Sequence, residues 1–506
     1  MYIDNKILVG KNKNQESFIL LDKTNRHGLI TGASGSGKTI TLKVLAESFS
    51  DAGVPVFLAD VKGDIAGTCL PGEMNDKIKE RLNNIDIKNF KMKGFPIHFW
   101  DVYGKKGHPI RTTVKEVGVL ILSRMLGLTE AQEGVLAIAF KIASDKNLDL
   151  VDLKDLKILL TYIGEHRKEF ITTYGNIATQ TIGGIQRSIL QLENSGGDFF
   201  FGEPNLEIND LIKNNDEDKG YINIMDCVEL FKSPDLYACF LLWLLTTLYQ
   251  NMKEVGDTEK PKIVFFFDEA HLLFNNMPSY MLKEVVQVVK LIRSKGIGLF
   301  FISQAPTDIP DSILGQLGNR IQHTLRAYTP AEEKIIKVAA SAFRVNKKFD
   351  TEEAIRNLGT GEALVSFQNE KGEPTIVEKV TKLPPQIQMG TIDESTRLMV
   401  MTNSLYKGKY DTPIDRESAY EKLSSLLEEE NQQKENEEKQ KEEEKIAKQK
   451  AKEEEKAAKE KAKAEKEKER ERKNSPQYKL GKKVVNKTTD KIINRIINSI
   501  IKKILK

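Results

Sequence analysis

The fold is decided by the stretch Gly32-Ala33-Ser34-Gly35-Ser36-Gly37-Lys38-Thr39, which has the GxxxxGK(S/T) spacing of a phosphate-binding loop. Apolar residues precede it, and a helical pattern continues from Ile40. Glycines let backbone N–H groups converge on phosphates, and the helix after the loop directs the positive end of its dipole at them. A plain glycine turn is the alternative, which the flanking strand and helix patterns disfavour. We therefore predict nucleotide contacts from Gly32 through Ile40.

A second stretch ends in two acids that complement this loop. The run Ile263 to Phe267 is apolar throughout, as in a central parallel strand, and Asp268 and Glu269 follow it. Lys38 is expected to contact the β- and γ-phosphates, while Thr39 and Asp268 hold Mg²⁺. Glu269 is expected to polarise the water that attacks the γ-phosphate. A glutamate directly after this aspartate favours ATP over a GTPase of the Ras type, and two solvated acids are the alternative.

Charged residues also follow the strand pattern from Val54 to Ala59. Asp60, Lys62 and Asp64 come directly after it. Because ligands collect at the carboxyl ends of parallel strands, we expect these side chains near the nucleotide. A charged turn is the alternative. The strand before the phosphate loop, the helix after it and this strand are predicted to form one βαβ unit with parallel pairing.

Three further candidates come from the later strands. Gln304 follows the strand Gly298 to Ser303, where it is expected to sense the γ-phosphate or to hold the attacking water. Arg320 and Arg326 come after it, and either is a candidate arginine finger that acts in trans on the nucleotide of a neighbouring subunit. For both arginines, a surface ion pair is the alternative.

The overall composition predicts a soluble, cytoplasmic protein. The formal net charge is +4 over 506 residues, so any basic patch must be local. The three cysteines, Cys69, Cys227 and Cys239, have no CxxC spacing, which indicates a reducing compartment without disulfides or structural zinc. The longest apolar run, around Tyr237 to Tyr249, is too short to span a bilayer.

The C-terminal part of the chain changes character. Residues from roughly Ser424 to Lys473 are mainly Glu, Lys and Ala, and opposite charges three and four positions apart favour an exposed helix. Sustained apolar a and d positions are lacking, so a single exposed helix and a coiled coil both stay open. Beyond it, apolar pairs from Ile492-Ile493 to Ile504-Leu505 recur every four residues among lysines. This pattern predicts a basic amphipathic helix that lies on a membrane surface, associates with copies of itself or docks on its own protein.

The motifs occur in one characteristic order. They are the phosphate loop, Asp-x-Lys-Gly-Asp, Asp-Glu-Ala-His, Gly-x-Gly-x-x-x-x-Ser-Gln, Asn-Arg and Gly-Glu-Ala-x-Val. From about Ile7 to Leu383 the chain resembles the HerA/FtsK superfamily of P-loop motor ATPases, particularly the bacterial HerA-like helicase-domain proteins. The resemblance implies a RecA-like core that assembles into a ring, usually a hexamer, and moves double-stranded DNA through its pore by ATP hydrolysis. The chain departs from that pattern in lacking room for a large N-terminal β-barrel and in carrying the charged C-terminal stretch.

We therefore expect an α/β protein with a RecA-like P-loop core, a mostly parallel central sheet, a helical insertion and a charged helical C-terminal extension. The expected parts are an N-terminal hairpin with the first part of the core, 1–112; the helical insertion, 113–215; the second part of the core, 216–385; a linker, 386–423; the charged helix, 424–474; and the basic tail helix, 475–506. Within the insertion, Thr129-Glu130-Ala131-Gln132 reads as a capping box that opens a helix.

The predicted function is an ATPase that acts as a translocase or helicase on double-stranded DNA. Contacts with DNA are expected to be independent of sequence, because no helix-turn-helix or zinc module is recognisable. The alternative is an ATP-dependent assembly or scaffold ATPase that uses the isoleucine-rich tail as a membrane anchor and does not translocate DNA.

Overall fold

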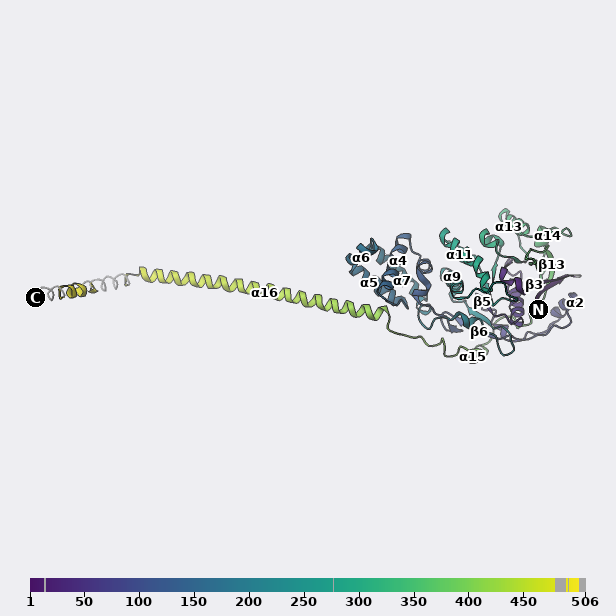
Figure 1. Ribbon diagram of the computed structural model, residues 1–506, viewed down its shortest axis with the longest axis horizontal. Helices are drawn as coiled ribbons and strands as arrows, with labels where there is room; N and C mark the ends of the chain where they lie inside the picture. The colour runs from purple at the N-terminus through teal and green to yellow at the C-terminus, as the bar shows by residue number, and fades with distance from the viewer. Residues whose placement is uncertain (13–14, 276, 478–487, 490, 500–506) are drawn as a thin grey trace. The chain divides into compact units, whose positions relative to one another are not determined.

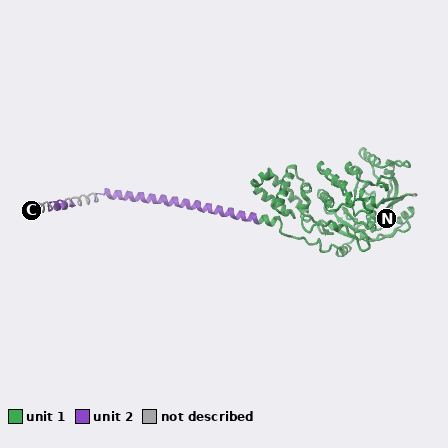
Figure 2. Cartoon of the chain, in the orientation of Figure 1, with its two compact units in different colours: residues 1–424 green, residues 425–506 purple. Residues whose placement is uncertain are grey.

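The computed structural model describes residues 1–12, 15–275, 277–477, 488–489 and 491–499. The chain divides into two compact units, Met1–Ser424 and Ser425–Lys506 (Figure 2). The first unit contains the sheet and the helices that cover it (Figure 1). Its strands are β1 (Tyr2–Ile3), β2 (Lys6–Asn12), β3 (Gln15–Leu20), β4 (Gly28–Thr31), β5 (Val56–Asp60), β6 (Ile97–Asp101), β7 (His108–Pro109), β8 (Ile222–Asp226), β9 (Ile263–Phe267), β10 (Ile297–Ser303), β11 (Asn319–Gln322), β12 (Glu362–Ser366) and β13 (Glu378–Lys382).

All these strands belong to one sheet, in the order β1-β2-β13-β12-β11-β4-β10-β9-β5-β8-β6-β7, with β3 paired to β2. Neighbours from β11 through β7 pair in parallel, and the flank from β11 to β1 is antiparallel. The central strands β4, β10, β9, β5 and β8 are buried along their whole length, which explains their continuous apolar runs. The predicted α/β class with a mostly parallel central sheet is confirmed.

The order of the central strands corrects one expectation. Strands β4 and β5 do not pair with each other, because β10 and β9 lie between them. The two edges of β4 are occupied by β10 and β11. The expected βαβ unit with adjacent strands is therefore wrong, and the reason is that the two most apolar strands take the most covered position in the sheet. As a consequence, β10 lies between β9, which precedes the paired acids, and β4, which precedes the phosphate loop.

Helix α1 (Lys38–Asp51) covers the centre of this sheet. Its residues from Thr41 to Ser50 are buried. The ring centroid of Phe49 lies 6.1 Å from that of Phe300 and 6.3 Å from that of Phe266. Burial of these aromatic side chains fixes the C-terminal half of α1 on β9 and β10, so its first turn is held at the carboxyl edge of the strands.

Six helices lie between β7 and β8 in the sequence, and Figure 1 shows α4 to α7 grouped together beside the sheet. They are α3 (Val114–Met125), α4 (Glu130–Asp145), α5 (Leu153–Glu165), α6 (Arg167–Tyr174), α7 (Thr179–Asn194) and α8 (Gly197–Phe200). The capping box predicted at the start of α4 is confirmed, since the Thr129 amide donates to Gln132 Oε1 at 2.9 Å. The other helices of the first unit are α2 (Asp76–Asn84), α9 (Pro234–Asn251), α10 (His271–Phe274), α11 (Ser279–Leu291), α12 (Asp311–Leu314), α13 (Pro330–Ser341), α14 (Thr351–Arg356) and α15 (Glu394–Thr402).

Residues 386–423, expected to be a linker, pack onto the core instead. Tyr406 and Tyr410 are buried, and the ring of Tyr406 lies 5.1 Å from that of Trp100 on β6. The Tyr410 hydroxyl donates to Asp210 Oδ2 at 2.6 Å, and the Tyr406 hydroxyl donates to the Asp210 carbonyl. The segment was predicted to be a linker because most of its residues are polar. These two tyrosines nevertheless bury as much surface area as residues of the core and so fix it in place.

The second unit begins within α16 (Ala419–Asn474), a helix of 56 residues. Every side chain from 431 to 474 is exposed. Glutamates pair with lysines four positions later, at Glu437–Lys441, Glu444–Lys448, Glu455–Lys459 and Glu469–Lys473. This is the more favourable order of the two charges along a helix. The predicted charged helical extension is confirmed.

The predicted tail helix, 475–506, lies partly outside the described residues, and so do the apolar pairs Ile500-Ile501 and Ile504-Leu505. Residues 491–499 are helical, and Ile492, Ile493, Ile496 and Ile497 are each about half exposed there. Over the part of the chain that is described, no helix has both the length and the apolar character needed to cross a membrane.

Candidate active site

The phosphate loop joins the end of β4 to the first turn of α1. Gly37 precedes the helix with φ of +99°, a backbone conformation that glycine adopts without strain. No described side chain caps the first turn, so its N–H groups can receive an anion. The Gly32 amide donates to the Gln304 carbonyl at 3.2 Å, and the Ala33 amide donates to the Thr324 carbonyl at 2.9 Å. The loop is therefore fixed to the ends of β10 and β11.

Lys38 bends back over this loop. Its Nζ donates to the carbonyls of Gly32 at 2.6 Å and Ala33 at 3.2 Å. Burial lowers the pKa of Lys38, and the carboxylates of Glu269 and Asp268 oppose that shift. The register of β10 pairs Ser303 with Thr31 of β4 and Phe301 with Phe267 of β9, so the loop and the acid pair leave the sheet at the same edge and share one site.

The acid pair, Asp268 and Glu269, directly follows strand β9. Burial is the main cause that raises the pKa of Asp268 to about 6, and the adjacent Glu269 adds to the rise. Glu269 has φ of +48°, a strained conformation for a residue other than glycine. Its amide donates to Asp268 Oδ1 at 3.0 Å, and the Ala270 amide donates to the Ile302 carbonyl at 2.9 Å. The neighbouring strand β10 thus stabilises the turn that carries both acids.

The Glu269 carboxylate retains an unused acceptor. Its Oε2 is buried and accepts no hydrogen bond from the described residues, and His271 Nδ1 lies 3.5 Å from it. Buried acceptors nearly always have a hydrogen-bond partner, so this oxygen is suited to accept a hydrogen bond from a bound water molecule or from a ligand of a bound cation. The hydroxyl of Thr39 and the carboxylate of Asp268 are hard oxygen donors of the kind that Mg²⁺ prefers. The residues therefore fit the expected metal.

The end of β10 contributes both an expected and an unexpected residue. The side chain of Gln304 is exposed at this edge. Asp308, which sequence reasoning missed, accepts from Ser303 Oγ at 2.6 Å and from the Ala305 amide at 2.8 Å. Its carboxylate also interacts with Lys38. The signal in the sequence was an acid at position N3 of a short 3₁₀ helix, Pro306–Asp308, which starts three residues after the strand ends.

The turn after β5 divides its charged residues between two roles. Asp60 accepts hydrogen bonds from the amides of Gly63 at 2.7 Å and Ile65 at 3.0 Å, so its carboxylate stabilises the turn itself. Lys62 is exposed and interacts electrostatically with both Lys38 and Asp268. Of Asp60 and Lys62, it is therefore Lys62 whose charge acts on the acid pair.

The two arginines occupy different environments. The guanidinium of Arg320 donates to the carbonyls of Leu314 at 3.1 Å, Leu317 at 3.2 Å and Ala342 at 3.0 Å. Burial lowers its pKa, and three of its five donors bind carbonyls of its own chain, an arrangement that favours a structural role over the expected arginine finger. Arg326 is exposed and follows Thr324, whose carbonyl binds the phosphate loop. It remains a candidate.

Sequence reasoning also missed two buried residues beneath the loop. His323, at the end of β11, lies with Nε2 3.0 Å from Thr41 Oγ1. Lys382, the last residue of β13, donates to the same hydroxyl at 2.7 Å and to the Gly37 carbonyl at 3.1 Å. The sequence of β13 could have indicated that Lys382 is buried. Successive side chains of a strand point to opposite faces, so Lys382 shares a face with Val380, which is buried.

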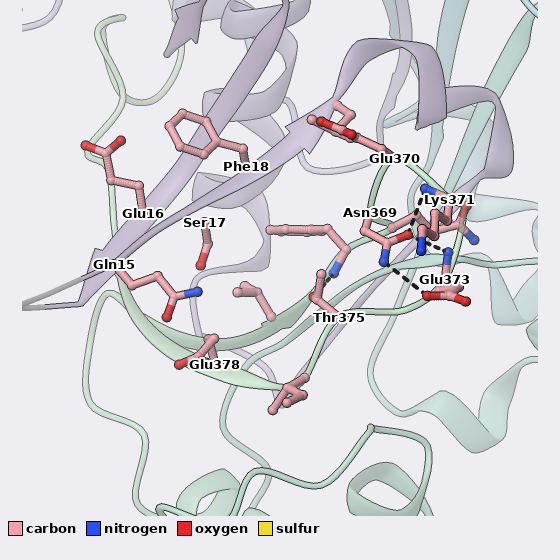
Figure 3. A pocket seen from close by; sticks show the side chains of 15 residues that line it. Gln15, Glu16, Ser17, Phe18, Asn369, Glu370, Lys371, Glu373, Thr375 and Glu378 are labelled. Carbon is pink, nitrogen blue, oxygen red and sulfur yellow. Dashed lines mark hydrogen bonds between the residues drawn. The ribbon is translucent and has the colours of Figure 1, made fainter.

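A cavity of about 780 Å³ lies elsewhere, on the antiparallel flank. Figure 3 shows Gln15 to Phe18 of β3 on one side of it and the turn from Asn369 to Glu373 on the other. Asn369 Oδ1 accepts from the Glu373 amide at 2.9 Å and closes that turn. Four glutamates and one lysine line the cavity, together with apolar and uncharged residues, a charge balance that disfavours a phosphate. None of the predicted site residues is among those lining it.

The fold and the site define a P-loop nucleotide-binding ATPase whose acid pair is separated from the loop strand by one further strand. The family described as Helicase HerA-like C-terminal matches residues 5–505, and the chain belongs to this family. The predicted resemblance is thus confirmed.

Two proteins of similar sequence share one name. The DNA double-strand break repair helicase HerA of Saccharolobus solfataricus is 23% identical over 393 residues, which cover 76% of this chain and 69% of that protein. The protein of the same description from Sulfolobus acidocaldarius is 22% identical over 388 residues, covering 74% of this chain and 68% of its own length.

Among solved structures, the plasmid coupling protein TrwB in complex with a non-hydrolysable GTP analogue is similar with a TM-score of 0.50 and 12% identity. The similarity covers 77% of this chain and 91% of that chain, and it shows a shared fold.

Proposed function

We propose that this chain is an ATP-hydrolysing motor that moves along double-stranded DNA. The observation that carries the proposal is the meeting of Lys38 with Asp268 and Glu269 at the carboxyl edge of the sheet, where they can face one triphosphate. The description of the relatives as DNA double-strand break repair helicases supports DNA as the track.

ATP turnover measured with and without duplex DNA tests this function. We expect stimulation by DNA, and DNA affinity that falls steeply with salt because binding releases counterions. The same assay on a chain ending at Ser424 separates the motor from the second unit. Absence of stimulation in both proteins contradicts the proposal and favours an ATPase that does not translocate DNA.

Each residue of the site has a role in this proposal. The loop amides and Lys38 bind the phosphates and neutralise charge that develops on them. Thr39 and Asp268 would hold Mg²⁺, which supplies further charge neutralisation when bound. Glu269 Oε2 orients the attacking water and accepts its proton, and Gln304 contacts the γ-phosphate or that water.

In a ring of subunits, for which we favour a hexamer, a residue from the neighbouring subunit would complete this site. Arg326 is the residue proposed to act in trans, because it is exposed close to where β11 binds the phosphate loop. Mixing two inactive variants, Arg326→Ala and Glu269→Gln, tests it directly. Recovery of turnover on mixing is expected if sites are shared between subunits, and no recovery contradicts a role in trans. Mass photometry of the wild-type protein gives the ring size.

Contact with a membrane surface is proposed for the tail. The observation that favours it is the set of half-exposed isoleucines at 492, 493, 496 and 497 next to Lys491 and Arg495. Co-sedimentation with anionic vesicles should decrease when residues 490–506 are deleted. Equal sedimentation of the two proteins contradicts the contact.

A further inference from the structure

Strand β13 places a lysine directly beneath the phosphate loop. Lys382 is 3% exposed, and its Nζ donates to the Gly37 carbonyl at 3.1 Å and to Thr41 Oγ1 at 2.7 Å. The Lys382 amide donates to the Gly361 carbonyl at 2.8 Å, and the strand register pairs Lys382 with Gly10. The backbone therefore fixes this ammonium at the junction of loop and helix, where a triphosphate binds.

The charge of Lys382 has no counterpart in the surrounding structure. Among the described residues, no carboxylate forms an ion pair with it. The charged and titratable groups that face it are Arg81 from α2 and His323, which directly follows β11. Burial lowers the pKa of His323 well below its usual value and so keeps the ring neutral. Burial, with a smaller contribution from Arg81, lowers the pKa of Lys382 to about 7.

We propose that Lys382 is a second cation of the phosphate-binding site, which positions Gly37 and Thr41 and takes up a proton when a nucleoside triphosphate binds. The inference rests on the proposed function only in requiring that the loop binds a nucleotide. A buried cation without an anionic partner is costly, and the phosphates supply the missing negative charge.

The direction of the pH dependence follows from this arrangement. Phosphates near Lys382 favour its charged form and raise its pKa in the complex above the value in the free protein. Between these two values, binding takes up a proton. Nucleotide affinity should therefore be greatest below pH 7 and fall as the pH rises through about 7, until the pKa of the complex is reached.

Isothermal titration calorimetry of the full chain tests the proposal. The probe is a non-hydrolysable ATP analogue with Mg²⁺, titrated at pH 8 in two buffers that differ in ionisation enthalpy. The wild-type protein should take up a larger fraction of a proton than Lys382→Arg, which stays charged. Lys382→Met should bind about tenfold more weakly, the effect of losing one charge-assisted hydrogen-bonding group. Lys382→Arg should retain most of the affinity.

Lys379→Met is the matched control. Lys379 lies on the same strand, is 42% exposed and pairs with Glu362 at 2.9 Å. Its substitution should change neither the affinity nor the proton uptake.

Two results overturn the inference. One is equal proton uptake by the wild-type protein and Lys382→Arg, and the other is unchanged affinity in Lys382→Met. The comparison of proton uptake uses only the wild-type protein and the conservative variant Lys382→Arg, so a misfolded Lys382→Met does not remove the test. Absence of any nucleotide binding by the wild-type protein would refute the proposed function as well, which distinguishes the two failures.

Discussion

The carboxyl edge of the sheet and helix α16 are stabilised in opposite ways. At the sheet edge, Lys38, Asp268 and Lys382 come from segments far apart in sequence. Lys38 and Lys382 donate to carbonyls of the phosphate loop, and the Tyr237 hydroxyl of α9 donates to the Asp268 carbonyl. In α16, the described ion pairs join residues four positions apart, and side chains from 431 to 474 are exposed. The edge therefore depends on the whole fold, whereas the helix depends on local sequence.

This difference predicts where substitutions have large effects. A change at the edge removes a contact that several strands build together and leaves a buried group unsatisfied. A change in α16 removes one solvent-screened pair among many. Effects of substitution should therefore be strongest at the edge and weakest in the helix.

Glu269→Gln should have the largest effect. Loss of the general base at this position should reduce ATP turnover by about 100-fold or more. Because the amide keeps the shape of the side chain, nucleotide affinity should stay within a few-fold of the wild-type value. Phosphate release and equilibrium binding measure the two quantities, and normal turnover would show that another residue is the base.

Lys38→Ala should act on binding itself. Removal of the ammonium that covers the loop should weaken nucleotide affinity by about 10- to 100-fold, as expected for one or two charge-assisted hydrogen bonds. Fluorescence titration with a labelled nucleotide gives the value. Lys371→Ala, in the turn beside the cavity on the antiparallel flank, is the control and should bind normally. Equal affinities of the two variants would contradict the phosphate-loop assignment.

Much of this edge could be predicted from the sequence, because the loop and the acid pair are local patterns with a fixed spacing. The order β4-β10-β9-β5 could not, since strand pairing is decided by which strands bury best in the assembled sheet. Lys382 acts through contacts with residues more than 300 positions away, and Asp308, whose hydrogen bonds are local, reaches the site only through its interaction with Lys38. The helical character of α16 followed directly from the spacing of its charges.

Arg320→Met should destabilise the first unit, while Arg326→Met should not. Three backbone carbonyls lose their donor in Arg320→Met, at a cost of about 2 kcal/mol in the free energy of unfolding. The exposed Arg326 should contribute less than about 0.5 kcal/mol. Denaturant unfolding followed by circular dichroism compares them. Equal destabilisation would show that Arg326 has structural contacts as important as those of Arg320.

Glu455→Lys in α16 should have the smallest effect. It replaces an attraction to Lys459, now at 2.6 Å, by a repulsion, and should cost roughly 0.5 kcal/mol of helix stability. Circular dichroism of the full chain at low and high salt measures the change, which should shrink as salt screens the charges. A loss of helix across the whole of α16 would mean that the helix is held by more than local pairs.

The structure of Glu269→Gln bound to ATP and Mg²⁺, determined by electron cryomicroscopy, would show whether the loop and the acid pair hold the same nucleotide. We expect one nucleotide whose γ-phosphate lies about 3 Å from Lys38 Nζ, with the metal between Thr39 and Asp268. A triphosphate bound away from the loop, or a metal without contact to Asp268, would contradict this expectation.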